Sequence, residues 1–140
     1  MLPKGTNLER NGIRLAGAPI GTDEFCKNYM KKKVNEIKLK MNALDGINPQ
    51  IGLALLRTGI VPDLILVSQV TPPELTLESL TEHDKNIINT AFKFLNPADR
   101  ANPPKYSNSR KNRAIDILRL PIRDNGAGLT ESALIAPIAY

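Results

Sequence analysis

Lysine and arginine side chains gather at two places in this chain, one towards each end. Cations of this kind neutralise phosphates, and each contact with a nucleic-acid backbone adds salt-sensitive, sequence-independent affinity. Two glycines belong with them, because a tight backbone turn that leads into a basic helix is a common way to grip a phosphate backbone. The candidate nucleic-acid-binding residues are Gly17, Gly21, Lys27, Lys31, Lys32, Lys33, Arg110, Lys111, Arg113 and Arg123.

The charge distribution supports a polyanionic partner for both ends. The net charge of +5 divides into +5 for residues 1–44, −4 for residues 45–99 and +4 for residues 100–140. Two basic ends flanking an acidic middle are typical of proteins that bind a polyanion. The alternative for the lysine cluster is a solvated helix face that binds no ligand.

Stacking partners for nucleic-acid bases are scarce, since aromatic residues make up 4% of the chain and Trp is absent. Tyr29 and Tyr106 are the tyrosines near basic residues. Tyr29 lies close to an apolar stripe and is expected in the core. Tyr106 is the better stacking candidate, because it lies in the Pro- and Asn-rich loop expected at 96–108.

The sequence does not assemble a catalytic centre. His83 is the single histidine and Cys26 the single cysteine, which leaves no zinc cluster and no histidine-activated nucleophile. His83 is expected at the surface or as a capping residue, and Cys26 as a partly buried, inert thiol. The adjacent carboxylates Asp23 and Glu24 are explained by a helix N-terminus rather than by Mg²⁺ binding. We therefore predict no enzyme activity for this chain alone, no metal and no cofactor.

Composition indicates an intracellular protein, cytoplasmic or nuclear. A lone cysteine fits a reducing compartment, and the N-terminus lacks the apolar core of a secretory signal. The apolar stretch at residues 51–70 is interrupted by Pro62 and carries Arg57 and Asp63, so we predict no membrane partner.

The elements that would position these residues are mostly helices. Residues 8–20 predict an extended segment or hairpin with a turn at Asn11-Gly12. Thr22 is a candidate N-cap for a helix ending near Asp45-Gly46. Its apolar stripe, at mostly helical spacing, comprises Phe25, Met30, Val34, Ile37, Met41 and Leu44.

The middle of the chain predicts two further helices. Asn48-Pro49 starts the first, residues 51–70 are apolar on nearly every face and should be buried, and Pro62 should kink or split them. After Pro72-Pro73, residues 77–95 predict an amphipathic helix. Its inward residues are expected to be Leu80, Ile87, Ile88, Ala91, Phe92 and Leu95.

The C-terminal part predicts a loop at 96–108, a short basic helix at 109–118, a turn at Asp124-Asn125-Gly126 and a last helix capped by Thr130. The fold class expected is mainly α, a thumb-like bundle of about four to five helices with a short N-terminal β-hairpin or extended segment. The organisation expected is a hairpin segment at 1–21, a helical core at 22–95, the loop at 96–108, and a basic helix, glycine turn and final helix at 109–140.

Five motifs in order resemble the region downstream of the catalytic palm in the reverse transcriptases of non-LTR (LINE-type) retrotransposons. Residues 12–25 are similar to the family's Leu-Gly-x-Pro-Ile-Gly-x-x-x-Phe run at the primer-grip hairpin, and residues 49–57 to its Pro-Gln-x-x-x-x-Leu-Leu-Arg helix. Residues 70–73 resemble its Arg-Thr-x-Pro-Pro stop, and residues 83–84 a following His-Asp or Phe-Asp. Residues 120–129 with 133–140 resemble Leu-Pro-x-x-x-Gly-Gly-x-Gly-Leu and Ala-Ala-Tyr.

The resemblance implies a helical thumb that holds a primer–template duplex beside a palm. Residues 12–21 would then position the primer end, and the lysine helix would follow the backbone. The Tyr-x-Asp-Asp metal-binding motif of this family lies upstream of the region and is absent here. The expected function is a non-catalytic fragment of an RNA-directed DNA polymerase that binds an RNA–DNA or RNA template–primer duplex, with a palm domain supplied upstream.

Two alternatives remain open from the sequence. The apolar helix at 51–70 could pair with another protein or another copy, which would make the chain a freestanding helical interaction module without a nucleic-acid role. The chain could also be the product of a decayed reading frame with no function.

Overall fold

The computed structural model describes residues 11–95 and 108–139. Tyr106 and nearly all of the loop predicted at 96–108 lie outside the described residues, as do residues 1–10 of the N-terminal segment. The described part is mainly α with a short N-terminal hairpin, which confirms the predicted fold class.

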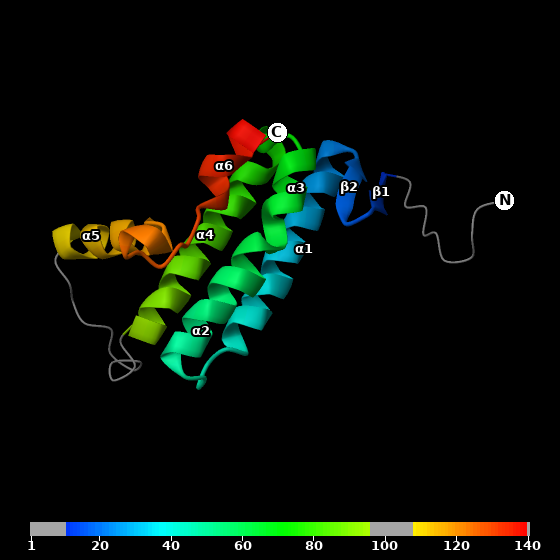
Figure 1. The fold of residues 1–140 in the computed structure, drawn as a ribbon. Coiled ribbons are helices and arrows are strands. Elements are labelled where there is room, and N and C mark those ends of the chain that lie inside the picture. Colours follow the sequence, from blue (N-terminus) through cyan, green and yellow to red (C-terminus); the bar gives the residue numbers. More distant parts are fainter. Residues whose placement is uncertain (1–10, 96–107, 140) are drawn as a thin grey trace.

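Helices α1 (Asp23–Asn42) and α4 (Pro73–Leu95) lie alongside a central rod made of α2 (Pro49–Leu55) and α3 (Ile65–Val70) (Figure 1). A hairpin of β1 (Gly12–Leu15) and β2 (Ala18–Gly21) lies at one end of this layer. Helix α5 (Asn108–Arg119) projects from the opposite side, and α6 (Ser132–Ala139) crosses α4 and contacts α3.

The hairpin turn is at Ala16-Gly17, so the turn predicted at Asn11-Gly12 is wrong. β1 and β2 are antiparallel, with Gly12 opposite Gly21 and Leu15 opposite Ala18. Ala16 and Gly17 both have positive φ, 49° and 91°. Two positive-φ residues make the two-residue turn whose twist matches that of the paired strands.

Helix α1 follows its local signals. The Thr22 hydroxyl accepts a hydrogen bond from the N–H of Phe25 at 3.3 Å, which confirms the predicted N-cap. Most of the predicted stripe is buried, namely Met30, Val34, Ile37 and Met41, and Cys26 joins it. These side chains form the core together with Leu56, Leu64, Leu80, Ile87 and Ala91 from the neighbouring helices.

The rod from residue 49 to 70 is split, as predicted, but it is less buried than predicted. Asn48 caps its start by accepting from Gln50 N–H at 3.0 Å. A π-helical turn at Leu56–Ile60 and a 3-10 turn at Val61–Leu64 separate α2 from α3, because Pro62 has no N–H to donate. The rod covers α1 and α4 with one face only, so an apolar stripe stays exposed, comprising Ile51, Leu55, Leu66 and Val70.

The segment Pro49–Val70 is long and apolar enough to cross a membrane by length and composition alone. Mostly buried core helices of soluble proteins pass the same test, and 39% of the most apolar window of this segment is buried. Here the segment packs on α1 and α4, and the Lys40 ammonium lies 2.6 Å from the Asp63 carboxylate at its middle.

Helix α4 begins at Pro73, four residues before the predicted start. Leu80, Ile87 and Ala91 are buried as predicted, whereas Leu95 is 48% exposed and Phe94 is buried in its place. Phe94 packs on Gly52 of α2, where an added Cβ would meet its ring at 2.5 Å. The close approach of α2 to α4 at Gly52 is thus filled by Phe94 rather than by Leu95.

Two predictions about polar residues near α6 are wrong. His83 is fully buried rather than at the surface, and neither ring nitrogen has a hydrogen-bond partner. Thr130 does not begin the last helix, which starts at Ser132. The buried carboxylate of Asp84 accepts hydrogen bonds from the N–H groups of Ser132 and Ala133, at 3.0 and 2.9 Å, and thereby caps α6.

Candidate nucleic-acid interface

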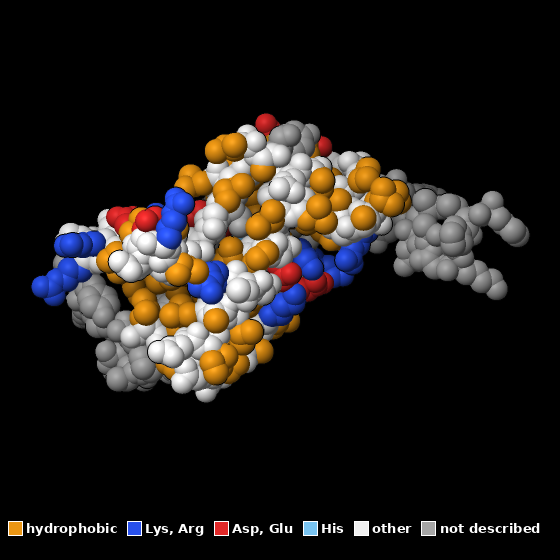
Figure 2. All heavy atoms as spheres, viewed as in Figure 1, with side chains coloured by type: hydrophobic (Ala, Val, Ile, Leu, Met, Phe, Trp, Pro, Cys, Tyr) orange, Lys and Arg blue, Asp and Glu red, His pale blue; other side chains and the backbone are white. Residues whose placement is uncertain are grey.

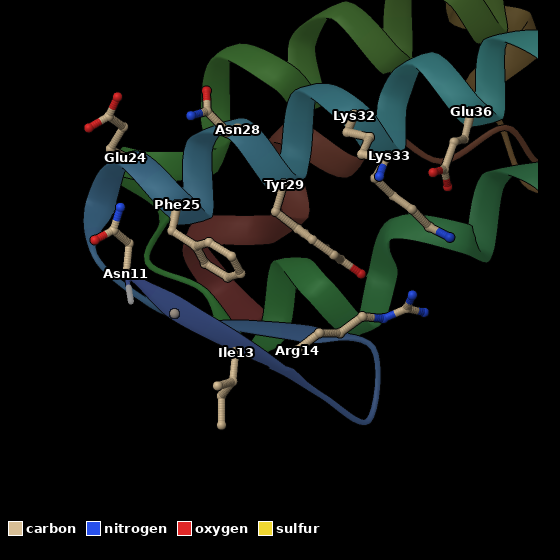
Figure 3. A pocket seen from close by; sticks show the side chains of 11 residues that line it. Asn11, Ile13, Arg14, Glu24, Phe25, Asn28, Tyr29, Lys32, Lys33 and Glu36 are labelled. Carbon is tan, nitrogen blue, oxygen red and sulfur yellow. The ribbon is translucent and has the colours of Figure 1, made fainter. Parts of the chain in front are cut away.

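A groove of about 490 Å³ separates β1 from the first four turns of α1 (Figure 3). Asn11, Gly12 and Arg14 form one wall, and side chains of α1 form the other. The Arg14 and Lys33 side chains extend to the same end of the groove, whereas Ile13 points away from it. The groove therefore presents two cations from two separate elements at one end.

The aromatic residues of the groove hold the hairpin on α1. The Phe25 ring packs on Gly12, where an added Cβ would lie 2.5 Å from the ring. The Tyr29 hydroxyl donates a hydrogen bond of 2.8 Å to the carbonyl of Gly17. The Arg14 guanidinium lies 6.0 Å from the centre of the Tyr29 ring, at the outer limit of a cation–π contact.

Tyr29 is half-buried, so its predicted structural role is confirmed in part. Because its hydroxyl is bonded to the hairpin and its ring faces Arg14, the groove offers cations rather than a free stacking surface.

Helical geometry divides the three consecutive lysines. Lys32 and Lys33 line the groove, whereas Lys31 and Lys27 do not. Residues four apart on a helix share a face, so Lys27 and Lys31 lie together on another side of α1. Glu24 and Glu36 also line the groove. Glu24 lies at the end opposite to Arg14 and Lys33, whereas Glu36 lies near Lys33.

The two predicted glycines shape the hairpin and do not line the groove. Gly17 occupies the second turn position with φ of 91°. Gly21 lies opposite Gly12, and an added Cβ there would collide with the backbone of Asn11 and Gly12. Gly17 thus allows the turn and Gly21 allows the close pairing of β1 with β2.

The second basic set lies at the other end of the molecule. Arg110, Lys111 and Arg113 are exposed on α5, which Figure 1 shows far from the hairpin. Arg123 is exposed in the turn after α5, and its Nε lies 3.5 Å from the neighbouring Asp124 carboxylate. Figure 2 shows basic side chains at both ends with hydrophobic side chains exposed between them. The predicted residues therefore form separate sites rather than one continuous surface.

Sequence reasoning missed Arg14, which the structure places opposite Lys33. The alternation of side chains between the two faces of the hairpin could have indicated its position. Ile13, Leu15 and Ile20 share one face of the paired strands, so Arg14 lies on the other face, which packs towards α1. Without the correct turn position, this register could not be read.

Catalytic and metal-binding alternatives gain no support from the described residues. In the ranges 11–95 and 108–139, no group of three or more His, Cys, Asp or Glu side chains could hold a metal ion. The Cys26 thiol is buried against the Pro19 carbonyl at 3.8 Å, and burial raises its pKa. A raised pKa disfavours the reactive thiolate.

The fold and groove define a mainly α bundle with a cleft, lined by three basic and two acidic side chains, under a docked hairpin. No protein-family model matches the chain, and no curated protein or solved structure matches it significantly.

Proposed function

We propose that this chain is a non-catalytic, thumb-like module that holds template–primer nucleic acid by its phosphate backbone in the groove between β1 and α1. The observation that carries the proposal is the docking of the hairpin, which brings Arg14 to the same end of the groove as Lys33, while Lys32 also lines the groove. The proposal agrees with the resemblance to the region downstream of the palm in LINE-type reverse transcriptases. An upstream palm would supply the catalytic carboxylates, and the module would act in the nucleus or cytoplasm.

The geometry favours contact with the backbone over reading of bases. Phe25 and Tyr29 are engaged with the hairpin, so they are poorly placed to stack on bases. Cations without stacking partners give affinity that is independent of sequence and falls steeply with salt. An RNA–DNA duplex, whose two phosphate backbones run side by side, is the expected ligand.

The test is binding of a labelled RNA–DNA duplex to the whole chain, followed by fluorescence anisotropy over a range of salt concentrations. Lys32→Gln/Lys33→Gln should weaken binding and reduce the slope of log K against log salt by about 0.9 for each phosphate that the variant no longer neutralises. The matched control is Lys27→Gln/Lys31→Gln, which removes the same charge from another side of α1.

Equal weakening in the two double variants would show that overall charge, and not the groove, binds the duplex. No detectable binding of the unmodified chain at low salt would refute the proposal altogether. A circular-dichroism spectrum of each variant checks that α1 is intact.

A second candidate function, a helical interaction module, is favoured by the exposed stripe on the rod. Ile51, Leu55, Leu66 and Val70 are each 43–56% exposed, and Figure 2 shows hydrophobic side chains across this face. Sedimentation over a range of concentrations tests it. A dimer that is abolished by Leu55→Gln/Leu66→Gln and is indifferent to nucleic acid would favour this function over the first.

A further inference from the structure

A second groove, of about 640 Å³, lies between α4, α5 and α6, away from the hairpin. Its lining is largely apolar, with Leu77 and Ile88 from α4, Ile115 from α5 and Leu134 from α6. Leu134 is 67% exposed and Leu77 is 46% exposed. Exposed apolar side chains gathered in a groove are a feature of surfaces that bind another molecule.

The charged groups that remain unpaired at the groove are positive, because its carboxylates are engaged in contacts within the chain. The Asp84 carboxylate is occupied by the N–H groups that begin α6, and Glu131 is paired with Arg119. Lys85 and Lys111 line opposite sides of the groove, are exposed, and form no ion pair with any residue in the described ranges. An occupant that complements the groove is therefore apolar on one face and acidic on its flanks.

The helical walls of the groove favour a helical peptide over an extended one as the bound molecule. The walls are formed by three helices, whose backbone N–H groups are bonded within the helix or, at the start of α6, to Asp84. An extended peptide would find no free strand edge with which to pair, whereas a helix satisfies its own backbone. From Leu77 to Ile88 the groove follows α4 for about 17 Å, the length of about three helical turns.

We propose that this groove binds a short amphipathic α-helix of a partner protein, with leucine-type side chains on its inner face and Asp or Glu on its flanks. Leu77, Ile88 and Leu134 contact the apolar face, and Lys85 and Lys111 pair with the acidic flanks. Nucleic acid fits this groove less well, because its lining is more apolar than that of the groove at the hairpin.

The probe is a 14-residue helical peptide with Leu at positions spaced 4, 3 and 4 apart and Glu at the flanking positions. Its control is the same peptide with Lys in place of Glu. Binding of each labelled peptide to the whole chain is measured by fluorescence anisotropy. The acidic peptide should bind at least about ten-fold more tightly than the basic one.

Charge reversal sharpens the test. Lys85→Glu/Lys111→Glu should invert the preference between the two peptides, and Leu134→Ser should weaken both. Lys32→Glu/Lys33→Glu, which changes the groove at the hairpin by the same charge, should leave peptide binding unchanged while it weakens RNA–DNA duplex binding. The peptide site and the proposed nucleic-acid site are thus tested separately.

Three results with the peptides would overturn the proposal. They are no binding of the acidic peptide, equal binding of the two peptides, and a preference that survives charge reversal at Lys85 and Lys111. A fall in duplex binding in the Lys85/Lys111 variant as large as its fall in peptide binding would also overturn it, because the groove would then belong to a nucleic-acid surface.

Discussion

The Asp84 carboxylate on α4 accepts a 3.0 Å hydrogen bond from the N–H of Ser132, 48 residues away, and a second bond from Ala133. This pair of bonds fixes the short helix α6 against the longest helix of the bundle. The same two bonds give the buried carboxylate its donors and give the first N–H groups of α6 their acceptors.

Replacing Asp84 should therefore destabilise the fold. Asp84→Ala leaves two helix N–H groups without acceptors, and the free energy of unfolding in urea should fall by about 2–3 kcal/mol. Asp84→Asn keeps one acceptor and should destabilise less. The control is Asp116→Asn, because Asp116 is exposed and only distantly paired with Arg119 at 3.8 Å; a change there above about 0.5 kcal/mol would be unexpected.

His83 should make stability fall with acidification. Burial lowers the pKa of His83 to about 4, with the nearby Asp63 acting in the opposite direction. Between pH 6.5 and 4 the unfolded chain binds a proton at His83 that the folded chain does not bind. The free energy of unfolding is therefore highest above pH 6.5 and falls as the pH is lowered towards 4. The decline is about 3 kcal/mol by linkage.

His83→Leu, which is similar in volume and does not titrate, isolates this effect in urea titrations across the pH range. Its stability should show a flatter slope between pH 6.5 and 4. Burial raises the pKa of Asp84, which favours the fold at low pH, so the difference between the two proteins is the quantity to follow. Identical slopes would mean that His83 is not the titrating group.

The hairpin turn can be improved at Ala16. A non-glycine residue at φ of 49° is strained, and Asn-Gly is the preferred pair for such a turn. Ala16→Asn should stabilise the chain by about 0.5–1 kcal/mol in chemical denaturation. The same change at the exposed helical position Ala54 should have the opposite sign, since Asn is a weaker helix former than Ala.

Two glycines of the central rod should respond to alanine with opposite signs. Gly52→Ala places a methyl group 2.5 Å from the Phe94 ring, and overpacking of this kind costs about 1–3 kcal/mol. Gly59→Ala meets no atom within 4 Å and should gain up to about 1 kcal/mol from helix propensity. The melting temperatures of both variants, compared with that of the unmodified chain, test these signs. A higher melting temperature for Gly52→Ala would contradict the packing of α2 on α4.

Local signals predicted most of the secondary structure. Thr22 and Asn48 start helices because their side chains bond N–H groups two or three residues ahead. Pro62 splits the rod because its nitrogen carries no hydrogen. The hairpin turn was misplaced because Asn11-Gly12 has the preferred composition, whereas Ala16 adopts its conformation only in the context of the paired strands.

The candidate site was only partly predictable. Lysines were recognised by type, but the division of Lys32 and Lys33 from Lys31, and the arrival of Arg14 beside them, depend on where the hairpin docks. That docking rests on Phe25 against Gly12 and on the Tyr29 bond to the hairpin turn, contacts that span more than ten residues and leave no local pattern.

By itself, the sequence determined a helical chain with a capped basic helix and a split apolar rod, because capping, periodicity and residue type act within about four residues. The tertiary structure alone decided that Asp84 caps α6, that His83 is buried and that one face of the rod stays exposed. These outcomes depend on which helix faces meet, and packing between distant segments, rather than local preference, selects those faces.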